Sequence, residues 1–589
     1  MADKQFFSVQ KSLTKKRIFT HEEIENYIFD KNEELSEVSE EEYSLSDVSD
    51  EENSEPEILE LSLEEEMPAF VDALSSSDNS LENVFPGSYT PIWKSEPSNN
   101  GVHSFEFTGI SGCNQDIVKN DPLYLFELYF TDEICEFIVN ETNRYASQTI
   151  NKKELSIKSR MRRWLPVTVS EVRQYIAIFL YQGVLWKPAY EMYYTTNQLF
   201  ASAGIKWLLS YNKFKLIDKF IHFVDSSTLP NKYPVLSKIS TVWDYLTKKL
   251  QEVYTPPQNI SIDESLLLWK GRLSWKQCIC SKSARFGIKT FSLCESDSGY
   301  VWKSILYTGS ELTNTLSSDY RYVATKIVMF LMDSLVDQGY KLYIDSWYSS
   351  YELSSVLLLR STDTIGTLRK NRKGLPISIH EKLKKNERKV LYEEKTNIMI
   401  THWKDKKDVY TISTCTIDGT KNVLRAGKEK LVPLVIDDYN QSMGGVDRSD
   451  QMMTSYEVER KRVKKWYKKV FTHLINLAAF NAQIICKKMG RNMTPLNFRT
   501  MLITSMIQRY GQQPKKSHSR LVANNPLRLI DRHFPSYVPA SEKKINAQRR
   551  CVVCHKQKIR KDSRYECVEC DVGLCAAPCF MTFHTKTEY

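Results

Sequence analysis

The pattern of apolar and polar residues predicts that the first half of the folded chain is mainly helical. Between residues 115 and 254, apolar side chains recur every three or four positions, which is the spacing of amphipathic helices. Thr168 and Glu171 have the spacing of a capping box and precede one such stripe. Further stripes cover residues 211–224 and 242–253. We expect the aromatic residues of these stripes to form the cores between the helices.

Beyond Pro256 the pattern changes to the alternation that is typical of strands. Apolar residues alternate up to Asp263 and again up to Asp345, and a helix is predicted between them over residues 322–336. Further strands are predicted over residues 291–294, 300–307 and 364–368, and a further helix over residues 351–359. This order predicts an α/β core in which two strands lead to an aspartate. Residues 371–435 are rich in lysine and carry short β-like runs, so we expect an insertion there.

A glycine pair interrupts the pattern within the sequence DYNQSMGGVDRSDQ, at residues 438–451. The residues after the pair predict a helix on which Asp447 and Asp450 lie one turn apart on the same face. A longer helix is predicted from the apolar spacing between Val463 and Ile485. It opens with the basic sequence ERKRVKKWYKK, so a positively charged surface follows the two aspartates closely.

Length and composition indicate several globular domains. The chain has 589 residues, of which 41% are hydrophobic, and this length exceeds what one core accommodates. The net charge of +9 conceals an asymmetry, because residues 33–66 hold 16 acidic side chains and no lysine or arginine, which leaves +25 for the rest. We expect residues 1–114 to be a disordered acidic tail. The basic remainder favours a polyanionic partner such as double-stranded DNA.

The sequence also indicates where the protein acts in the cell. No apolar run reaches the roughly 18 residues that cross a bilayer, and the first residues lack the apolar segment of a signal peptide. We therefore expect an intracellular protein with no membrane partner and no small-molecule substrate. Basic residues between positions 543 and 561 are typical of a nuclear localisation signal or a DNA-contact surface. We expect the protein in the nucleus.

The C-terminal cysteines predict structural zinc. Six of the 13 cysteines lie within residues 551–579, and their CxxC pairs have the spacing of zinc ligands. The candidate ligands are Cys551, Cys554, Cys567, Cys570, Cys575, Cys579 and His584. Two closed tetrahedral sites need eight ligands, so His555 or another group would complete two Zn²⁺ sites. The pairing can be of the cross-brace type, and the spacing leaves the partition between the sites open.

Three aspartates are candidates for metal-dependent phosphodiester chemistry. Such chemistry without a covalent enzyme intermediate uses two divalent metals, and Mg²⁺ prefers carboxylate oxygens on a rigid scaffold. Asp263 on an early strand, Asp345 at the end of a central strand and Asp447 on a later helix have the arrangement of an RNase H-like fold. Spacing alone does not separate these residues from ordinary capping or surface aspartates, whereas the surrounding sequence does.

A series of sequence blocks resembles the piggyBac transposase family. In chain order they are YTPPQNISIDESLLLWKGRL, SKSARFGIKTFSLCESDSGY, YKLYIDSWYSS, IGTLRKNRKGLP, DYNQSMGGVDRSDQM, WYKKVFTHLINLAAFNA and the terminal Cys/His module. The resemblance covers roughly residues 115–589. One departure is Ser346, because family members commonly carry asparagine after the second aspartate.

The resemblance implies a multidomain α/β protein with an RNase H-like core of the DDE/D type. The implied domains are a helical dimerisation and DNA-binding domain at 115–260 and 456–535, a catalytic core at 261–370 and 436–455, a β-rich insertion at 371–435, a basic linker at 536–549 and a cysteine-rich zinc-binding domain at 550–589.

The resemblance further implies the chemistry and the partners. Asp263, Asp345 and Asp447 take the catalytic positions, with Asp450 as an accessory ligand for two Mg²⁺ (or Mn²⁺) ions. The implied activity is cut-and-paste transposition at TTAA sites through hairpin ends, by a homodimer that also binds transposon terminal repeats. Expected DNA contacts are Lys270, Arg272, Arg369 and Arg372, which lie in the family's blocks, and Lys461, Arg462, Lys464 and Lys465 at the basic helix opening.

Two other hypotheses remain open at this point. A domesticated derivative would bind DNA without transposing, although the presence of all three aspartates argues against lost chemistry. A RING-like ligase would use the Cys/His end, with the remainder as a scaffold, but such a scaffold does not require the block GGVDRSDQ.

Overall fold

A computed structural model describes residues 90–589 except for a set of gaps. The gaps are residues 99–103, 114–116, 153, 158, 196, 203, 226–234, 280–284, 426–427, 461–462, 512–528, 530–531, 541–543 and 587. The predicted acidic run at 33–66 and the predicted DNA contacts Lys461 and Arg462 lie outside the described residues.

The central sheet has the strand order of an RNase H-like core. Strand β4 (Asn259–Leu268) pairs antiparallel with β6 (Phe286–Glu295), which pairs antiparallel with β7 (Val301–Leu306). On its other side β4 pairs parallel with β8 (Lys341–Ile344), and β8 pairs parallel with β9 (Asp363–Leu368). The order is therefore β7–β6–β4–β8–β9, with an antiparallel meander joined to parallel strands. The predicted α/β core is confirmed.

Helices supply the crossovers that parallel strands require. The chain between β7 and β8 forms α7 (Ser310–Thr315) and α8 (Val323–Met332), and α9 (Tyr351–Leu359) joins β8 to β9. The apolar residues of β8 are completely buried, as expected for a parallel strand covered on both faces. Strand β5 (Gln277–Cys278) pairs with the first two residues of β6.

The lysine-rich residues 371–435 extend the central sheet, which the sequence pattern did not indicate. Strand β12 (Asp408–Ser413) pairs with β9, and β11 (Met399–Lys404) and β10 (Arg388–Glu393) continue the sheet beyond it. Strands β13 (Thr420–Arg425) and β14 (Lys428–Pro433) form a separate ribbon. Pairing with β12 satisfies backbone groups that would otherwise line an open edge of β9.

Part of the predicted disordered tail belongs to the folded body. Strand β1 (Trp93–Lys94) pairs with β10, and β2 (Gly112–Cys113) pairs with β3 (Tyr254–Thr255). Between them, the Phe105 N–H donates to the buried Asp363 carboxylate over 3.2 Å. The prediction of disorder over 1–114 is thus wrong for the described residues from 90 onward. Two-residue strands carry no periodic pattern that a sequence could display.

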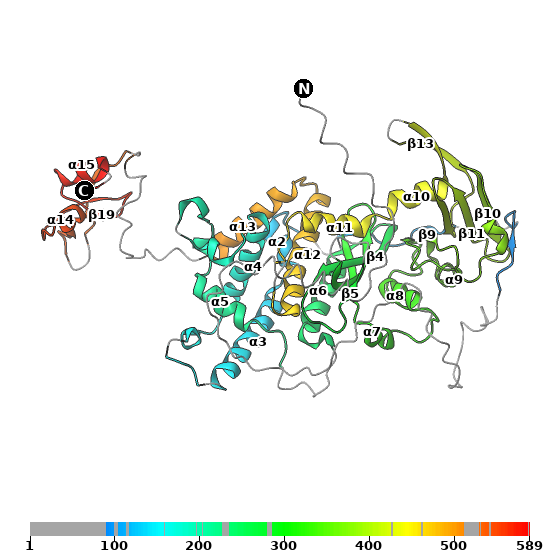
Figure 1. The fold of residues 1–589 in the computed structure, drawn as a ribbon, viewed down its shortest axis with the longest axis horizontal. Helices are drawn as coiled ribbons and strands as arrows, with labels where there is room; N and C mark the ends of the chain where they lie inside the picture. Colours follow the sequence, from blue (N-terminus) through cyan, green and yellow to red (C-terminus); the bar gives the residue numbers. More distant parts are fainter. Residues whose placement is uncertain are drawn as a thin grey trace, which may run out of the picture. The chain divides into compact units, whose positions relative to one another are not determined.

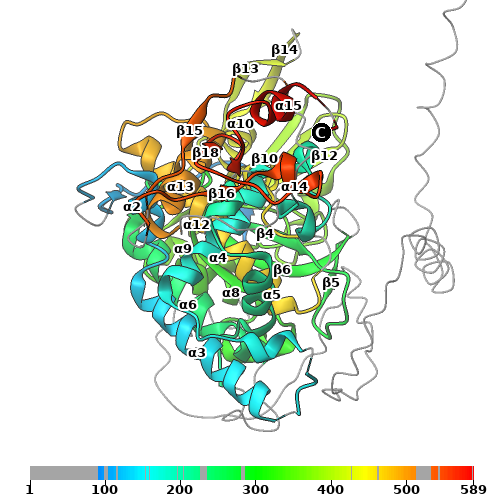
Figure 2. The ribbon, with the colours of Figure 1, turned by 90° about the vertical axis from the view of Figure 1, so that its left-hand side faces the viewer.

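Helices from two distant parts of the sequence pack into one body (Figures 1 and 2). The first set is α2 (Pro122–Glu127), α3 (Asp132–Asn151), α4 (Val169–Val184), α5 (Tyr211–Phe220) and α6 (Ser240–Val253), and the second is α12 (Trp466–Lys488) and α13 (Pro495–Tyr510). The capping box of Thr168 and Glu171 is confirmed at the start of α4. Asn481 of α12 bonds both backbone groups of Val301, which ties this helix to β7.

Short elements complete the described chain. The 3-10 helices are Arg160–Arg163, Tyr190–Tyr193, Gln198–Phe200, Gly204–Trp207, Val235–Lys238 and Ile377–His380. The C-terminal module contains β15 (Pro535–Tyr537), β16 (Arg549–Arg550), α14 (Val552–Lys556), β17 (Asp562–Ser563), β18 (Tyr565–Cys567), β19 (Val572–Gly573) and α15 (Cys579–Thr585). Within the described residues, no helix has the length and apolar character of a membrane span.

The glycine pair lets a late helix return to the first strand of the core. It lies between α10 (Leu434–Ser442) and α11 (Gly445–Thr454), and α11 packs against β4 and β6 (Figure 1). A Cβ atom on Gly445 would lie 2.5 Å from Ser261 Oγ and 2.8 Å from the Glu295 carbonyl oxygen. Gly444 has no such neighbour within 4 Å. Only the second glycine is therefore required for close packing.

This difference predicts unequal effects of two neighbouring substitutions. Gly445→Ala should lower the free energy of unfolding by about 1–3 kcal/mol, because the added methyl overpacks a closed contact. Gly444→Ala is the matched control and should leave stability nearly unchanged. Thermal and urea denaturation of the two variants measure the effect. Equal stability of Gly445→Ala and wild type would show that α11 is not held this closely against the sheet.

Candidate functional site

Asp263 and Asp345 lie at equivalent positions on two neighbouring strands. Ile262 of β4 pairs with Ile344 of β8, and each aspartate is the next residue along its strand. The Glu264 N–H donates to Asp263 Oδ1 over 2.8 Å, and the Trp347 N–H donates to Asp345 Oδ1 over 2.9 Å. Both carboxylates are half-buried. Parallel pairing thus brings together two aspartates that are far apart in the sequence.

Helix α11 adds the third aspartate from the face where it meets the sheet. Asp447 lies exposed in its first turn, and Asp450, one turn later, accepts a hydrogen bond from Ser265 Oγ of β4 over 2.7 Å. Arg448 donates to the carbonyl oxygens of Ser296, over 2.7 Å, and Asp297 in the β6–β7 turn. The motif therefore combines a glycine that allows close approach, an arginine that anchors the helix and an aspartate, Asp450, that contacts β4.

One hydroxyl is influenced by all three aspartates. Tyr439 of α10 has its pKa raised by burial and further by the charges of Asp345, Asp263 and Asp447, while a hydrogen bond with Thr367 opposes the shift. The pairing of β4 with β8 and the packing of α11 against β4 account for this shared influence. The ligand oxygens of the three aspartates are not, however, all within 4.8 Å of one another, unlike those of the two Cys/His groups described below.

The electrostatics of this neighbourhood favour a bound cation. Burial raises the pKa of Asp345, and the charge of Glu264 adds to the shift, whereas the Trp347 N–H and Arg369 oppose it. The carboxylates therefore repel one another in a partly desolvated setting, and a divalent cation relieves this repulsion. Oxygen donors of this kind match the preference of Mg²⁺ or Mn²⁺. The site residues fit the divalent metal that this type of core uses.

A basic surface joins the catalytic sheet to α12. Trp275, beyond β4, packs edge-on against Trp466 at the start of α12, with ring centroids 5.2 Å apart. The contact brings the exposed loop of Lys270 and Arg272 toward the segment of Lys464, which is also exposed. These side chains were predicted DNA contacts. Lys465 lies over the rings of Tyr145 and Tyr467, at 5.6 and 5.8 Å.

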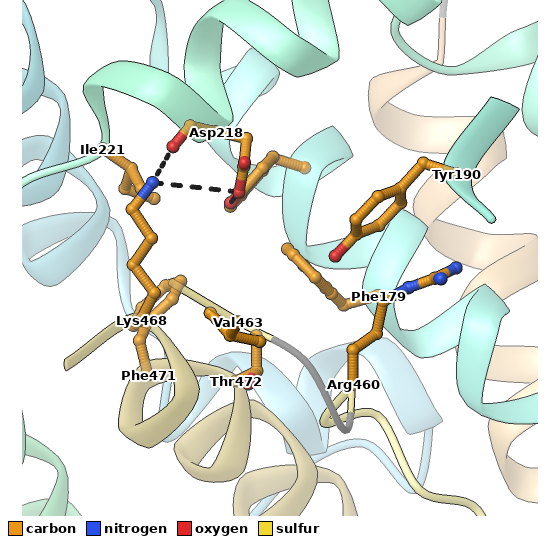
Figure 3. Close-up of a pocket in the computed structure, with 10 residues that line it drawn as sticks. Phe179, Tyr190, Asp218, Ile221, Arg460, Val463, Lys468, Phe471 and Thr472 are labelled. Atoms are coloured by element: carbon orange, nitrogen blue, oxygen red, sulfur yellow. Dashed lines mark hydrogen bonds and ion pairs between the residues drawn. The ribbon is translucent and has the colours of Figure 1, made fainter. Parts of the chain in front are cut away.

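Figure 3 shows how the start of α12 and the segment before it are anchored. Lys468 extends across a small pocket to Asp218, where it donates to the backbone carbonyl and lies 4.0 Å from the carboxylate. Arg460, on the other side, lies 3.9 Å from the ring centroid of Tyr190. Burial lowers the pKa of Lys468 to about 8, against the opposing charge of Asp218. These cations hold the fold together and are directed away from solvent.

Two arginines predicted to contact DNA have different surroundings. The charge of Arg369 acts on Asp345, so this arginine lies beside the carboxylate site. Arg372 instead directs its guanidinium at backbone carbonyls in the loop after Asp345, with Nε 2.8 Å from the Ser349 oxygen. In the sequence, Arg369 and Arg372 are equivalent basic residues. Only the tertiary structure shows that the guanidinium of Arg372 already donates hydrogen bonds within the protein.

The C-terminal module forms two groups of four metal ligands. One group is Cys551, Cys554, Cys575 and Cys579, and the other is His533, Cys567, Cys570 and His584. Thiolates about 2.3 Å from a tetrahedral zinc lie roughly 3.8 Å apart. Cys554 Sγ lies 3.9 Å from Cys575 Sγ and 3.6 Å from Cys579 Sγ. The first group therefore has the dimensions of a zinc site.

The ligand atoms of the second group also have the spacing of a zinc site. His533 Nδ1 lies 3.4 and 3.5 Å from the sulfurs of Cys567 and Cys570, and His584 Nε2 lies 3.6 Å from Cys570. The other nitrogen of His584 lies 2.8 Å from the Phe580 carbonyl oxygen, so it carries the proton and leaves Nε2 for a metal. The ligand pairs alternate between the groups along the chain, which is a cross-brace arrangement.

His533 corrects the suggestion that His555 completes the ligand set. His555 is exposed and belongs to neither group. The module also begins before the predicted boundary at residue 550, because β15 pairs with β18. No CxxC-like spacing links His533 to the first cysteine, so the sequence offered no signal for it. Arg549 of the predicted basic linker is paired with Glu566 and Asp571, both over 2.7 Å.

The RNase H-like sheet, the neighbouring aspartates and the zinc module together have the organisation of the DNA transposase class with a C-terminal zinc finger. A family model described as Transposase IS4 matches residues 121–483, and one described as DDE_Tnp_1-like zinc finger matches residues 532–585. The chain belongs to the piggyBac transposase family.

Known proteins agree with this assignment. Human PiggyBac transposable element-derived protein 3 is 25% identical over 485 residues, which are 80% of this chain and 77% of the relative. Human PiggyBac transposable element-derived protein 2 is 26% identical over 379 residues, which are 61% of this chain and 60% of the relative. The piggyBac transposase in a cryo-EM synaptic complex with hairpin DNA has a TM-score of 0.63 at 22% identity, covering 79% of this chain and 98% of that chain. The structural likeness supports the fold.

The ligand geometry predicts which histidine binds zinc. His533→Ala should reduce the zinc content of the purified protein from two ions per chain to one, because it opens one of the two four-ligand groups. His555→Ala, the matched control, should keep both ions. Elemental analysis by mass spectrometry measures the content. Full zinc in His533→Ala, or loss in His555→Ala, would overturn the ligand assignment.

Proposed function

We propose that this protein is a cut-and-paste DNA transposase that excises and integrates a transposon at TTAA sites through hairpin ends. The observation that supports this most strongly is that strand pairing sets Asp263 beside Asp345 and that α11, which carries Asp447 and Asp450, packs against the strand of Asp263, since these residues come from three distant segments. A metal-dependent nuclease requires such a convergence, and a DNA-binding scaffold does not.

The residues of the chain have distinct roles in this proposal. Asp263, Asp345 and Asp447 would hold two Mg²⁺ or Mn²⁺ ions, with Asp450, which accepts a hydrogen bond from Ser265, as an accessory ligand. When bound, the ions activate the attacking oxygen and stabilise the leaving oxygen. Arg448 keeps α11 against the β6–β7 turn, so that Asp447 stays at the sheet.

The DNA is bound by surfaces around this centre. Lys270, Arg272, Lys464 and Lys465 provide positive charge beside the catalytic sheet, and Arg369 acts next to Asp345. The C-terminal module binds the terminal repeats of the transposon, and a homodimer in the nucleus holds two transposon ends. The helical body would provide the dimer contacts.

A second candidate is a domesticated protein that binds DNA without transposing. The human relatives favour it, because both are described as transposable element-derived proteins. The same experiment distinguishes the two functions. A RING-like ligase is not supported, since the matched zinc-finger model is of the transposase type.

A two-plasmid excision assay with a TTAA-flanked element tests the proposal. Wild type should excise precisely, and Asp263→Asn, Asp345→Asn and Asp447→Asn should each lose activity by on the order of 10³-fold or more, as expected when one member of a catalytic unit is removed. Asp319→Asn is the matched control, because Asp319 is an exposed aspartate whose carboxylate accepts from the Ser317 hydroxyl.

The outcomes separate the two candidate functions. Normal excision by Asp447→Asn would show that the triad is assigned wrongly. Specific DNA binding by wild type, together with no excision and no metal-dependent nicking of the same DNA, would support the domesticated protein. Loss of excision in Asp319→Asn would indicate that the assay reports folding rather than chemistry.

A further inference from the structure

The Asp345 carboxylate is held by the loop that follows it. The Asp345 carbonyl oxygen accepts bonds from the N–H groups of Tyr348, over 3.2 Å, and Ser349, over 3.1 Å, which closes a tight turn. Within this turn the Trp347 N–H reaches back to Asp345 Oδ1 over 2.9 Å. The direction of the carboxylate therefore depends on the conformation of residues 345–349.

Arg372 braces this turn from another part of the chain. Its Nε donates to the Ser349 carbonyl oxygen over 2.8 Å, and its Nη2 donates to the carbonyl oxygens of Ser346 and Trp347 over 2.9 and 2.5 Å. Arg372 follows β9, whereas the turn follows β8, so the bonds join two neighbouring strands at one end. A planar guanidinium can bind three carbonyls together, and an ammonium group cannot reproduce that geometry.

The turn at residues 345–349 is also packed closely against the sheet. Gly366 of β9 lies beneath it, and a Cβ atom there would be 2.1 Å from Ser349 Oγ and 2.9 Å from the Ile344 carbonyl oxygen. The Trp347 ring stacks on Phe291 of β6, with centroids 5.4 Å apart and an angle of 16°. The turn is thus seated on the sheet, and Arg372 binds the carbonyls on its remaining side.

We propose that Arg372 is a positioning residue that fixes the Asp345 carboxylate for divalent metal binding, rather than a contact to DNA. This inference rests on the proposed function. The Nε and Nη2 hydrogens of Arg372 are directed at the loop, so these donors are not available for phosphate. Arg372 instead holds the carbonyl oxygens of residues 346, 347 and 349, and the Trp347 N–H of the same turn sets the direction of the Asp345 carboxylate.

The test compares Arg372→Ala and Arg372→Lys with two other arginine variants. Arg369→Ala removes the neighbouring arginine that is expected to bind DNA. Arg360→Ala is the matched control, because Arg360 is an exposed arginine whose guanidinium binds Asp337 and not the turn. Mn²⁺ binding to the full chain is measured by electron paramagnetic resonance, and Asp345→Asn shows which binding belongs to the site. The rate of DNA nicking against Mg²⁺ concentration, and DNA affinity against salt in Ca²⁺, are measured in parallel.

The expected results are specific to positioning. Arg372→Ala and Arg372→Lys should both weaken Mn²⁺ binding about 10-fold and raise the half-saturating Mg²⁺ for nicking by a similar factor, since the loss of a group that orients a metal ligand typically costs 10–100-fold. Their DNA affinity should keep the wild-type salt dependence. Arg369→Ala should instead reduce the salt slope by about one and should not weaken Mn²⁺ binding, because it removes a positive charge near Asp345 and no bond to the turn.

Contrary results identify which idea fails. Wild-type Mn²⁺ affinity in a folded Arg372→Ala, with a reduced salt slope, would make Arg372 a DNA contact and overturn the inference. Rescue of metal binding by Arg372→Lys would also overturn it, because charge alone would then suffice. If Asp345→Asn binds Mn²⁺ as wild type does, the carboxylate site itself is wrong and the proposed function fails instead. Should Arg372→Ala unfold, Arg372→Lys provides the same comparison with the charge retained.

Discussion

The packing of α11 against β4 is the contact on which the candidate site depends. Helix α11 lies almost two hundred residues after β4, yet it carries two of the four aspartates of the site. The absence of a side chain at Gly445 allows the close approach, and Arg448 fixes the helix to the β6–β7 turn. Without this contact Asp263 and Asp345 would remain paired on the sheet, but no third carboxylate would join them.

The neighbouring carboxylates of the site repel one another, and local hydrogen bonds offset part of this repulsion. The Asp345 carboxylate accepts a hydrogen bond from the Trp347 N–H, and the Asp263 carboxylate accepts one from the Glu264 N–H. The Asp450 carboxylate accepts a hydrogen bond from the Ser265 hydroxyl. Each donor stabilises a charged carboxylate without neutralising the site as a whole. The remaining repulsion favours a bound divalent cation, which the proposed nuclease activity requires.

Positive charge has two separate uses in this protein. Lys270, Arg272 and Lys464 are exposed beside the sheet, where they can bind a polyanion. Lys468 and Arg549 are instead paired with acidic or carbonyl groups of the protein, and Arg372 braces a loop. A basic sequence block therefore contains both exposed residues that can bind a polyanion and residues that stabilise the fold. Composition alone does not distinguish the two kinds.

The sequence by itself determined the α/β class, the strand that carries Asp263, the strand that ends before Asp345, the helix carrying Asp447, and seven of the eight cysteine and histidine ligands. Local spacing encodes these features, because periodicity and CxxC pairs act over a few residues. Only the tertiary structure decided that β10–β12 extend the core sheet, that His533 is the eighth ligand and that Arg372 turns inward. Each of these depends on pairing between distant segments, for which neighbouring residues carry no signal.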